Sequence, residues 1–329
     1  MSNPSPVLPL RVAEIRELTP WVRRLRLEDT EGQPLPAFEP GAHVQVQVRL
    51  PGGELAWRHY SLIDLSAQGP VGQSPRSYAI AVRREEAGRG GSQYMHQLQV
   101  GQEVSVQPPK NDFPLQASPA GVLLLAGGIG ITPILTMAAS CVQQGIPVRM
   151  VYAGRERQAM AFVDELTALL GERLHLHADA EAGGPLEVGA VLDSCLAGEE
   201  VYVCGPQAML DAVLAAAKQR DWASGRIHFE LFNAPAAAAG DHAFEVVLAQ
   251  SGLSITVPAD RSVLDCLIDA GQDPMYDCQR GECGVCAVQV IEGEPDHRDH
   301  VLSQSERESG QVMHPCVSRC KGSRLVLDL

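Results

Sequence analysis

The chain has 329 residues, 45% hydrophobic and 20% charged, which is enough for two or three globular domains. Its 31 glycines and 23 prolines are spread between apolar runs, which excludes a disordered or fibrous protein. A formal net charge of −14 disfavours nucleic-acid binding, because phosphate contacts need clustered Lys and Arg. Without a long apolar stretch or a signal-like Met1–Leu10, the chain is expected in the cytoplasm and off the membrane.

The first part of the chain, up to Pro109, consists of short alternating runs separated by Gly and Pro turns. His43–Val48 and Tyr78–Val82 are typical of these runs. Alternation with a period of two predicts strands with one buried face. We therefore expect an antiparallel β-barrel or sandwich in a first domain at residues 1–112.

From Gly121 onward, continuous apolar runs alternate with helical segments. The predicted strands are 122–126, 148–152, 174–176 and 201–204, and the predicted helices are 160–170 and 208–218. Fully apolar strands alternating with helices indicate an α/β domain with a parallel sheet covered on both faces. We place this second domain at residues 113–233.

Small residues follow at Asn233–Gly240, and we interpret 234–240 as an interdomain linker. The third domain, residues 241–329, is predicted to be small and α+β. Its expected elements are a hairpin of 244–248 with 253–257, a helix at 263–270, and strands at 287–291 and 324–329. It holds 15 acidic and 7 basic residues. Such acidity suits either recognition of a partner or simple solubility.

The third domain also carries a cluster of cysteines. Nine cysteines, mostly gathered near the C-terminus, argue against a disulfide framework. Cys278, Cys283 and Cys286 have the spacing C-x4-C-x2-C, and Cys316 follows after 29 intervening residues. This spacing is typical of plant-type [2Fe–2S] ligation, with two thiolates on each iron. Glycines within the loop would let it curl around the sulfurs.

Two alternatives to the cluster stay open at this point. A zinc site would combine Cys283 and Cys286 with Cys316 and Cys320, but it would leave Cys278 without a role. In the second alternative, the cysteines bind no metal and are buried or free thiols. We expect Cys320 to be a core residue, as are Cys141, Cys195 and Cys266.

Two glycine-containing turns in the second domain follow predicted strands. Gly121–Pro133 is a strand, a glycine-rich turn and a helix start, an arrangement that aims backbone N–H groups at an anion. It is not the G-x-G-x-x-G fingerprint, and a purely structural turn is the alternative. Val201–Pro206 ends another strand in Cys-Gly-Pro. Both turns are expected at the carboxyl edge of one sheet, where ligands bind.

Two segments of the first domain suit a planar, phosphorylated ligand. Arg58–Leu62 offers a guanidinium, an aromatic ring and a hydroxyl, and Gly88–Ser92 adds a loop suited to anions. The alternative is an exposed arginine beside a tyrosine of the core.

These motifs occur in the order R-x-Y-S-L, G-G-I-G-I-T-P, C-G-P and C-x4-C-x2-C with a distant cysteine. In this order they resemble the phthalate dioxygenase reductase family, which includes vanillate O-demethylase reductase subunits. The resemblance covers the whole chain. It implies an FMN-binding antiparallel β-barrel, an NAD-binding α/β domain and a C-terminal plant-type ferredoxin domain of β-grasp fold.

The resemblance also implies site residues. Those for FMN are Arg58, Tyr60, Ser61, Ala81, Val82, Gly91 and Ser92. Those for the nicotinamide nucleotide are Gly127, Gly128, Thr132, Cys204, Gly205 and Pro206. The cluster ligands would be Cys278, Cys283, Cys286 and Cys316. The candidates for positioning the hydride transfer are Ser61, Cys204 and Phe232. FMN is favoured over FAD because no adenine-binding insertion follows Ser92.

The cofactor order suggests the function. NADH gives two electrons as hydride, a [2Fe–2S] cluster accepts one at a time, and a flavin can do both. We therefore expect a monomeric, NADH-dependent reductase that passes electrons to a separate terminal oxygenase of the Rieske type. The alternatives are a stand-alone NAD(P)H diaphorase and an iron–sulfur redox sensor. Arg155 and Arg157 follow a strand end where an adenosine ribose would lie, so NADPH stays an alternative to NADH as the electron donor.

Overall fold

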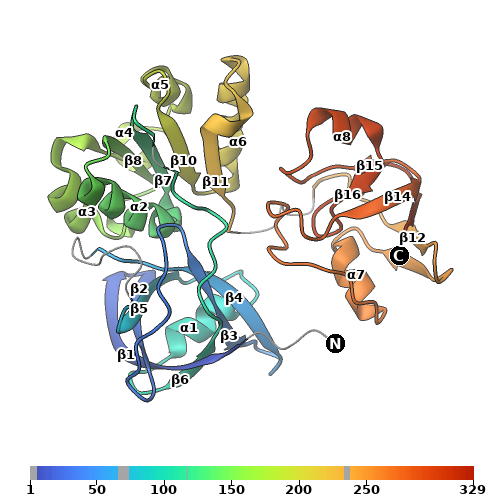
Figure 1. The fold of residues 1–329 in the computed structure, drawn as a ribbon, viewed down its shortest axis with the longest axis horizontal. Coiled ribbons are helices and arrows are strands. Elements are labelled where there is room, and N and C mark those ends of the chain that lie inside the picture. The colour runs from blue at the N-terminus through green and yellow to red at the C-terminus, as the bar shows by residue number, and fades with distance from the viewer. Residues whose placement is uncertain (1–5, 66–73, 117, 233–237) are drawn as a thin grey trace. The chain divides into compact units, whose positions relative to one another are not determined.

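The computed structural model describes residues 6–65, 74–116, 118–232 and 238–329. The chain forms two compact units, Met1–Glu230 and Leu231–Leu329, coloured blue to yellow and orange to red in Figure 1. Most of the predicted linker, residues 233–237, lies outside the described residues. The barrel and the α/β sheet belong to the same unit.

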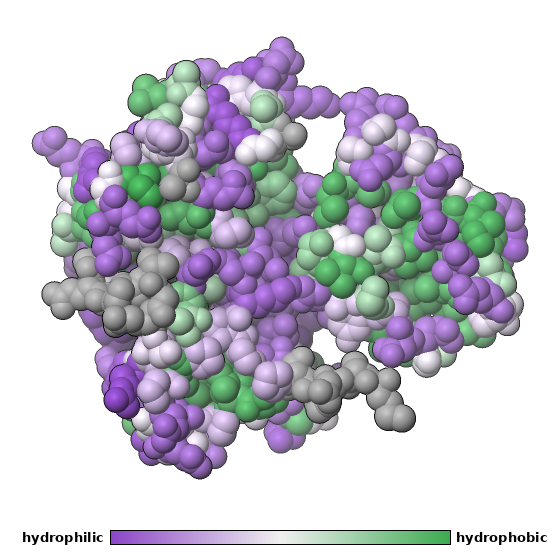
Figure 2. Space-filling view, in the orientation of Figure 1, coloured by the Kyte–Doolittle hydropathy of each residue, from purple (hydrophilic) through white to green (hydrophobic). Residues whose placement is uncertain are grey.

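On the face that Figure 2 shows, hydrophilic groups cover much of the first unit, and hydrophobic groups reach the surface of both units. Among the described residues, no helix is long and apolar enough to cross a membrane. All nine cysteines lie in the described part of the chain, and none of them is joined in a disulfide there.

The first sheet is antiparallel and has six strands in the order β4-β3-β6-β1-β2-β5. The strands are β1 (Leu8–Thr19), β2 (Val22–Asp29), β3 (His43–Arg49), β4 (Leu55–Ser61), β5 (Ser77–Arg83) and β6 (Glu103–Val106). The two edge strands, β4 and β5, also contact each other. Just beyond β4, the Ile63 N–H donates to the Ala79 carbonyl at 2.8 Å. The sheet thus curves into the predicted barrel.

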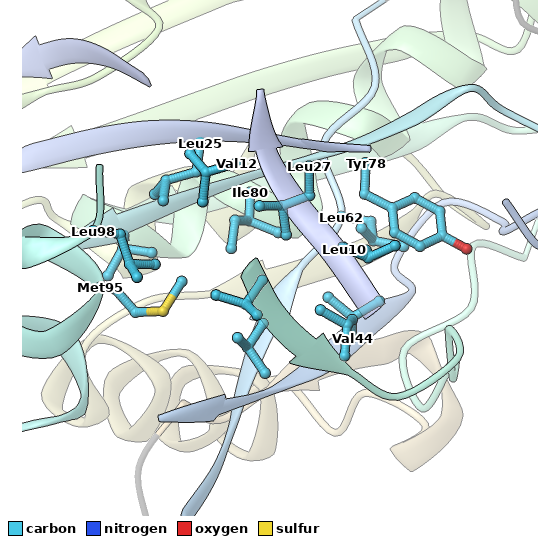
Figure 3. Packing of buried hydrophobic residues seen from close by; sticks show 14 of the residues in the cluster. Leu10, Val12, Leu25, Leu27, Val44, Leu62, Tyr78, Ile80, Met95 and Leu98 are labelled. Atoms are coloured by element: carbon cyan, nitrogen blue, oxygen red, sulfur yellow. The ribbon is translucent and has the colours of Figure 1, made fainter. Parts of the chain in front are cut away.

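The barrel interior is filled by the alternate residues of its strands. On β3, Val44, Val46 and Val48 are fully buried, whereas the residues between them are only half-buried. Figure 3 shows side chains of β1, β2, β3 and β5 converging with Met95 of helix α1 (Gly91–Gln97). Burying each such apolar side chain contributes roughly 1.5–3 kcal/mol, so the alternation determines which face of each strand points inward.

The second sheet is parallel, as predicted, with the order β11-β10-β7-β8-β9. Its strands are β7 (Val122–Gly127), β8 (Val148–Gly154), β9 (Leu174–Ala178), β10 (Glu200–Cys204) and β11 (Ile227–Glu230), of which β11 was not predicted. Its helices are α2 (Ile131–Gln144), α3 (Val163–Leu170), α4 (Asp179–Ala182), α5 (Val188–Asp193) and α6 (Gln207–Gln219). Short 3₁₀ turns are η1 (Gly128–Gly130), η2 (Arg157–Ala159), η3 (Gly171–Arg173) and η4 (Ser224–Arg226). All five carboxyl ends therefore share one edge.

A threonine of α2 joins the sheet to the barrel. The Thr136 hydroxyl donates to the Leu62 carbonyl at 3.0 Å and accepts the Asp64 N–H at 3.0 Å. Leu62 directly follows β4, so this contact brings the end of that barrel strand against α2. The hydrogen bonds of a buried hydroxyl depend on direction, and they hold the two layers in one arrangement.

The second unit has a five-stranded sheet, β13-β12-β18-β14-β16, and a small β15-β17 pair. Its elements are β12 (Phe244–Leu248), β13 (Ser254–Val257), α7 (Val263–Asp269), β14 (Val288–Glu292), β15 (Pro295–Asp296), α8 (Gln304–Ser309), β16 (Val312–Met313), β17 (Arg319–Cys320) and β18 (Arg324–Leu327). The predicted hairpin, helix and closing strand are present. Helix α7 begins where the Ser262 hydroxyl accepts the Asp265 N–H at 3.0 Å. Leu267 of α7 is buried in the core of the sheet.

Candidate functional site

The four predicted cluster cysteines form two pairs in the second unit. The loop between α7 and β14 carries Cys278, Cys283 and Cys286, and Cys316 lies between β16 and β17. The Cys286 and Cys316 sulfurs are 3.4 Å apart, and the Cys283 thiol contacts that of Cys278. Within the described ranges, no three His, Cys, Asp or Glu side chains are grouped to hold a single metal ion. Two pairs of thiolates suit the two irons of a [2Fe–2S] cluster.

The remaining cysteine of the zinc alternative lies elsewhere. Cys320 is buried in the hydrophobic core of the second unit, and its thiol contacts the Arg324 carbonyl at 3.5 Å. A four-cysteine zinc site would need this sulfur to join the others on one tetrahedral ion. The packing of Cys320 thus agrees with its predicted role as a core residue.

The cysteine loop is curled by residues with positive φ. Gly281 has φ +78° and Gly284 has φ +75°, a backbone conformation that favours glycine. A Cβ on Gly281 would lie 2.7 Å from Cγ2 of Val317, so the loop also needs the missing side chain. The Arg280 N–H points at the Cys278 sulfur, 3.3 Å away. Backbone N–H groups aimed at sulfur stabilise thiolates, which suits metal ligands.

The pairing of the thiols affects their ionisation. The contact with Cys286, together with burial, raises the pKa of the Cys316 thiol. The same contact lowers the pKa of Cys286. The pair therefore holds one negative charge more easily than two. A cation such as iron would neutralise the second thiolate, so the chemistry of this donor set fits a metal cluster.

A buried carboxylate supports the loop, and the sequence analysis missed it. The Asp299 carboxylate accepts the N–H groups of Val301 at 3.0 Å and Leu302 at 2.9 Å. It also lies 3.4 Å from Nδ1 of His314, and His314 hydrogen-bonds the backbone of Gly284 in the cysteine loop. The only local signal is that His314 stands two residues before Cys316. The link to Asp299 depends on tertiary structure.

The residues that the resemblance implies for FMN gather on one side of the barrel. Arg58, Tyr60 and Ser61 lie on β4, and Gly91 and Ser92 begin α1. A Cβ on Gly91 would lie 3.0 Å from Cγ of Arg58, so the arginine side chain covers the start of α1. The two segments are more than thirty residues apart in sequence. Their contact places a guanidinium beside backbone N–H groups, which suits a phosphate.

Strand β5 adds the remaining flavin candidates. Ala81 and Val82 are buried near the end of β5, which contacts β4. The Ser92 hydroxyl accepts the N–H of Glu85 at 3.0 Å and so links the chain leaving β5 to α1. Burial raises the pKa of the Tyr60 phenol, and this effect outweighs the nearby charge of Arg58. Tyr60 therefore stays a neutral hydrogen-bond donor at physiological pH.

The two glycine turns of the nucleotide sheet are in direct contact. A Cβ on Gly130 would lie 2.2 Å from the Cys204 carbonyl oxygen, and one on Gly127 would lie 2.6 Å from Cδ of Pro206. Gly205 lies between these contacts. Thr132 is buried, and its hydroxyl donates to the Ile129 carbonyl at 3.1 Å. The structure thus brings the predicted nucleotide residues together at the carboxyl edge.

The nucleotide turn also approaches the barrel. Arg83, the last residue of β5, has its Nη1 4.0 Å from where a Cβ of Gly128 would lie. The residue before it is Val82, a flavin candidate. Thr136, which binds the chain just after Ser61, stands one helical turn beyond Thr132. Two planar ligands held by these residues would be neighbours, as hydride transfer requires. Sequence analysis missed Arg83 and Thr136.

Phe232 lies at the start of the second unit and is half-buried there. Its neighbour Leu231 donates its N–H to the Glu282 carboxylate at 2.5 Å, and Glu282 belongs to the cysteine loop. The hydrogen bond of Leu231 therefore holds the backbone beside Phe232 against the cysteine loop. Its predicted position near a flavin remains a prediction.

A barrel and a parallel sheet that meet at adjacent candidate sites, joined to a unit with paired cysteines, define a modular electron-transfer reductase. Comparison with protein families agrees with this class. Residues 246–321 match the 2Fe-2S iron-sulfur cluster binding domain. Residues 102–227 match the N-terminal domain of the dimethylamine monooxygenase subunit DmmA-like family.

Known proteins resemble the chain over nearly its whole length. A putative toluene-4-sulfonate monooxygenase system reductase subunit of Comamonas testosteroni is 43% identical over 324 residues, covering 98% of this chain and 99% of the relative. The vanillate O-demethylase oxidoreductase of a Pseudomonas species is 38% identical, covering 97% and 98%. The solved structure of phthalate dioxygenase reductase has a TM-score of 0.73 at 37% identity and covers 98% of both chains. The chain belongs to the phthalate dioxygenase reductase family and is an oxidoreductase, as its motifs predicted.

Proposed function

We propose that this protein is the NADH-dependent reductase component of a multicomponent oxygenase. It passes electrons from NADH through FMN to a [2Fe–2S] cluster and on to a terminal oxygenase of the Rieske type. The observation that carries the proposal is the approach of Arg83, at the end of β5, to Gly128 in the nucleotide turn. This approach makes the flavin and nucleotide candidates neighbours. The domain boundaries proposed are 1–112, 113–233 and 241–329, with the linker at 234–240.

Bound in the barrel, FMN would accept an electron pair as hydride and release single electrons. Arg58 and the N–H groups of Gly91 and Ser92 would hold its phosphate. The neutral Tyr60 phenol would donate a hydrogen bond. Ala81 and Val82 would line the ring. FMN is favoured over FAD because only residues 98–102 separate α1 from β6, which leaves little chain for an adenine pocket.

Positioning of the nicotinamide would fall to the carboxyl edge of the sheet. Gly127, Gly128 and Thr132 would hold the nucleotide from one turn, and Gly205 and Pro206 from the other. Cys204 would stand beside the nicotinamide ring, Ser61 beside the reacting flavin nitrogen, and Phe232 against the flavin ring. These roles would require position rather than proton transfer, because a bound flavin would accept hydride directly from the nicotinamide ring.

The partner is proposed to be an oxygenase because relatives carry the names of reductase subunits of monooxygenase and demethylase systems. The cysteine loop is flanked by exposed apolar side chains. Met275 is 78% exposed, Tyr276 44% and Val285 41%, and all three lie within three residues of a cluster cysteine. Exposed apolar groups of this kind support docking of a protein at the loop. The cysteines form no disulfide among the described residues, which agrees with a reducing cytoplasm, and we propose that the reductase acts there as a monomer.

The test is an anaerobic titration of the purified chain with NADH. We expect about one flavin and two irons per chain, with both chromophores bleached by NADH. Cys283→Ser should abolish cytochrome c reduction while dye reduction at the flavin continues. Cys195→Ser, outside the loop, is the matched control. Cytochrome c turnover that survives Cys283→Ser would support the diaphorase alternative. Failure of NADH to reduce the flavin would overturn the proposal and favour the sensor.

A further inference from the structure

The carboxyl edge carries a group of charged residues beyond the candidate nucleotide turns. Arg155, Glu156 and Arg157 follow β8, and Asp179 and Glu181 follow β9. Strands β8 and β9 are paired and parallel, so both loops leave the same edge of the sheet. The Ala180 N–H donates to the Arg155 carbonyl at 3.0 Å, which holds the two loops together.

One of the two arginines is occupied by a carboxylate from the other loop. Nη2 of Arg157 lies 3.0 Å from Oε2 of Glu181, and Nε lies 3.4 Å from Oε1. Two nitrogens therefore face two oxygens in the forked arrangement that a phosphate would otherwise use. The Asp179 carboxylate lies 3.2 Å from Nε2 of His177 on the same side. The five charged residues after β8 and β9 thus form a corner of the sheet edge with three carboxylates and two guanidinium groups. The net charge of this corner is negative.

The position of the corner indicates which part of a dinucleotide would reach it. In the proposed function the nicotinamide lies over the turns that follow β7 and β10. Continuing along the sheet, the next strands are β8 and β9, so the adenosine end would lie over their loops. NADPH differs from NADH by a 2′-phosphate on this ribose.

We infer that Glu181 determines the specificity for NADH over NADPH by holding Arg157 away from the 2′ position and by adding negative charge there. A 2′-phosphate would have to displace the Glu181 carboxylate from Arg157 and approach Asp179 and Glu156 as well. A 2′-hydroxyl meets no such repulsion and can donate to a carboxylate. This inference rests on the proposed function, because it assumes that a pyridine nucleotide binds at this edge.

The test compares the full-length holoenzyme with Glu181→Gln. The ratio of kcat/KM for NADPH to that for NADH should rise about fivefold, in line with the strength of one exposed ion pair. Binding of adenosine 2′,5′-bisphosphate relative to AMP, measured by calorimetry, should rise by a similar factor. Adding Arg157→Ala should remove both gains. Glu172→Gln is the matched control, because Glu172 is also exposed but precedes β9 at the opposite edge.

The outcomes separate the two proposals. A ratio unchanged in Glu181→Gln, or a wild-type protein that prefers NADPH, would overturn the role of Glu181 while leaving the reductase function intact. A wild-type protein that oxidises neither nucleotide would instead overturn the proposed function. A gain that survives removal of Arg157 would show that Glu181 does not act through that arginine and would overturn the inference as stated.

Discussion

Gly130 and Cys204 are 74 positions apart, yet a Cβ on Gly130 would lie 2.2 Å from the Cys204 carbonyl oxygen. The turn after β7 therefore packs directly on the end of β10. Because the neighbour is backbone, it cannot rotate away as a side chain can. The contact requires glycine and joins the two turns into one surface.

Gly130→Ala should therefore destabilise the first unit and weaken nucleotide binding. We expect a loss of about 1–3 kcal/mol in the free energy of unfolding, as for other overpacked sites. Urea unfolding followed by tryptophan fluorescence suits this test, because all three tryptophans, Trp21, Trp57 and Trp222, belong to this unit. Gly225→Ala is the control, since a Cβ there would meet nothing within 4 Å. Equal stability of the two variants would contradict the packing argument.

The paired cysteines predict which thiols hold iron. Cys316→Ser should lose the visible spectrum of the cluster, because it removes one sulfur of the pair that lies 3.4 Å apart. Cys320→Ala should retain the iron, because Cys320 packs in the hydrophobic core. Metal analysis and electron paramagnetic resonance of both variants measure which of the two cysteines is needed to hold iron. Loss of metal from both would instead favour the zinc alternative.

The contact between Arg58 and the start of α1 predicts a phosphate site. Arg58→Ala should weaken FMN binding about tenfold or more, since a hydrogen bond to a charged group contributes roughly 1.5–3 kcal/mol. The measurement is titration of the flavin-free protein with FMN, followed by quenching of flavin fluorescence. Arg49→Ala is the control, because Arg49 lies on the neighbouring strand and hydrogen-bonds Gly53 instead. Unchanged affinity in Arg58→Ala would remove this residue from the site.

A pH-dependent ion pair stabilises the N-terminal part of the second unit. The hydrogen bond from Arg298, 3.0 Å from the Asp241 carboxylate, lowers the pKa of Asp241 to about 2. The pKa of an unfolded aspartate is about 3.9, so the folded state favours the ionised form. The stabilisation is complete above that value and is lost as the pH falls towards 2.

Asp241→Asn should lower the free energy of unfolding of the second unit by about 1–3 kcal/mol at pH 7, as expected when a charged partner is removed. The difference from wild type should shrink as the pH falls below about 4, where Asp241 of the unfolded chain begins to take up protons while the native carboxylate stays ionised until about pH 2. The visible circular dichroism of the cluster reports unfolding of this unit. Asp260→Asn, an exposed position, controls for the change of charge. A difference that stays constant down to pH 3 would argue against the ion pair.

Local patterns in the sequence were sufficient for much of the architecture. The alternation in His43–Val48 predicted a barrel strand, and the continuous run at 122–126 predicted a buried parallel strand. The spacing of Cys278, Cys283 and Cys286 predicted a [2Fe–2S]-binding domain. Each of these signals lies within a few residues, because side-chain period and ligand spacing are properties of a single segment.

Other features depend on contacts between distant segments. The strand β11, the approach of Arg83 to Gly128, the support of His314 by Asp299, and the pairing of Arg157 with Glu181 have no local pattern. Strand order and helix packing decide which of many possible neighbours meet, and they follow from burying apolar faces over a whole unit. The sequence by itself determined the order of the barrel, the parallel sheet and the iron–sulfur domain, and the spacing of the cysteines in that domain. Only the tertiary structure decided which side chains face one another across the carboxyl edge, because those contacts form after the sheet has assembled.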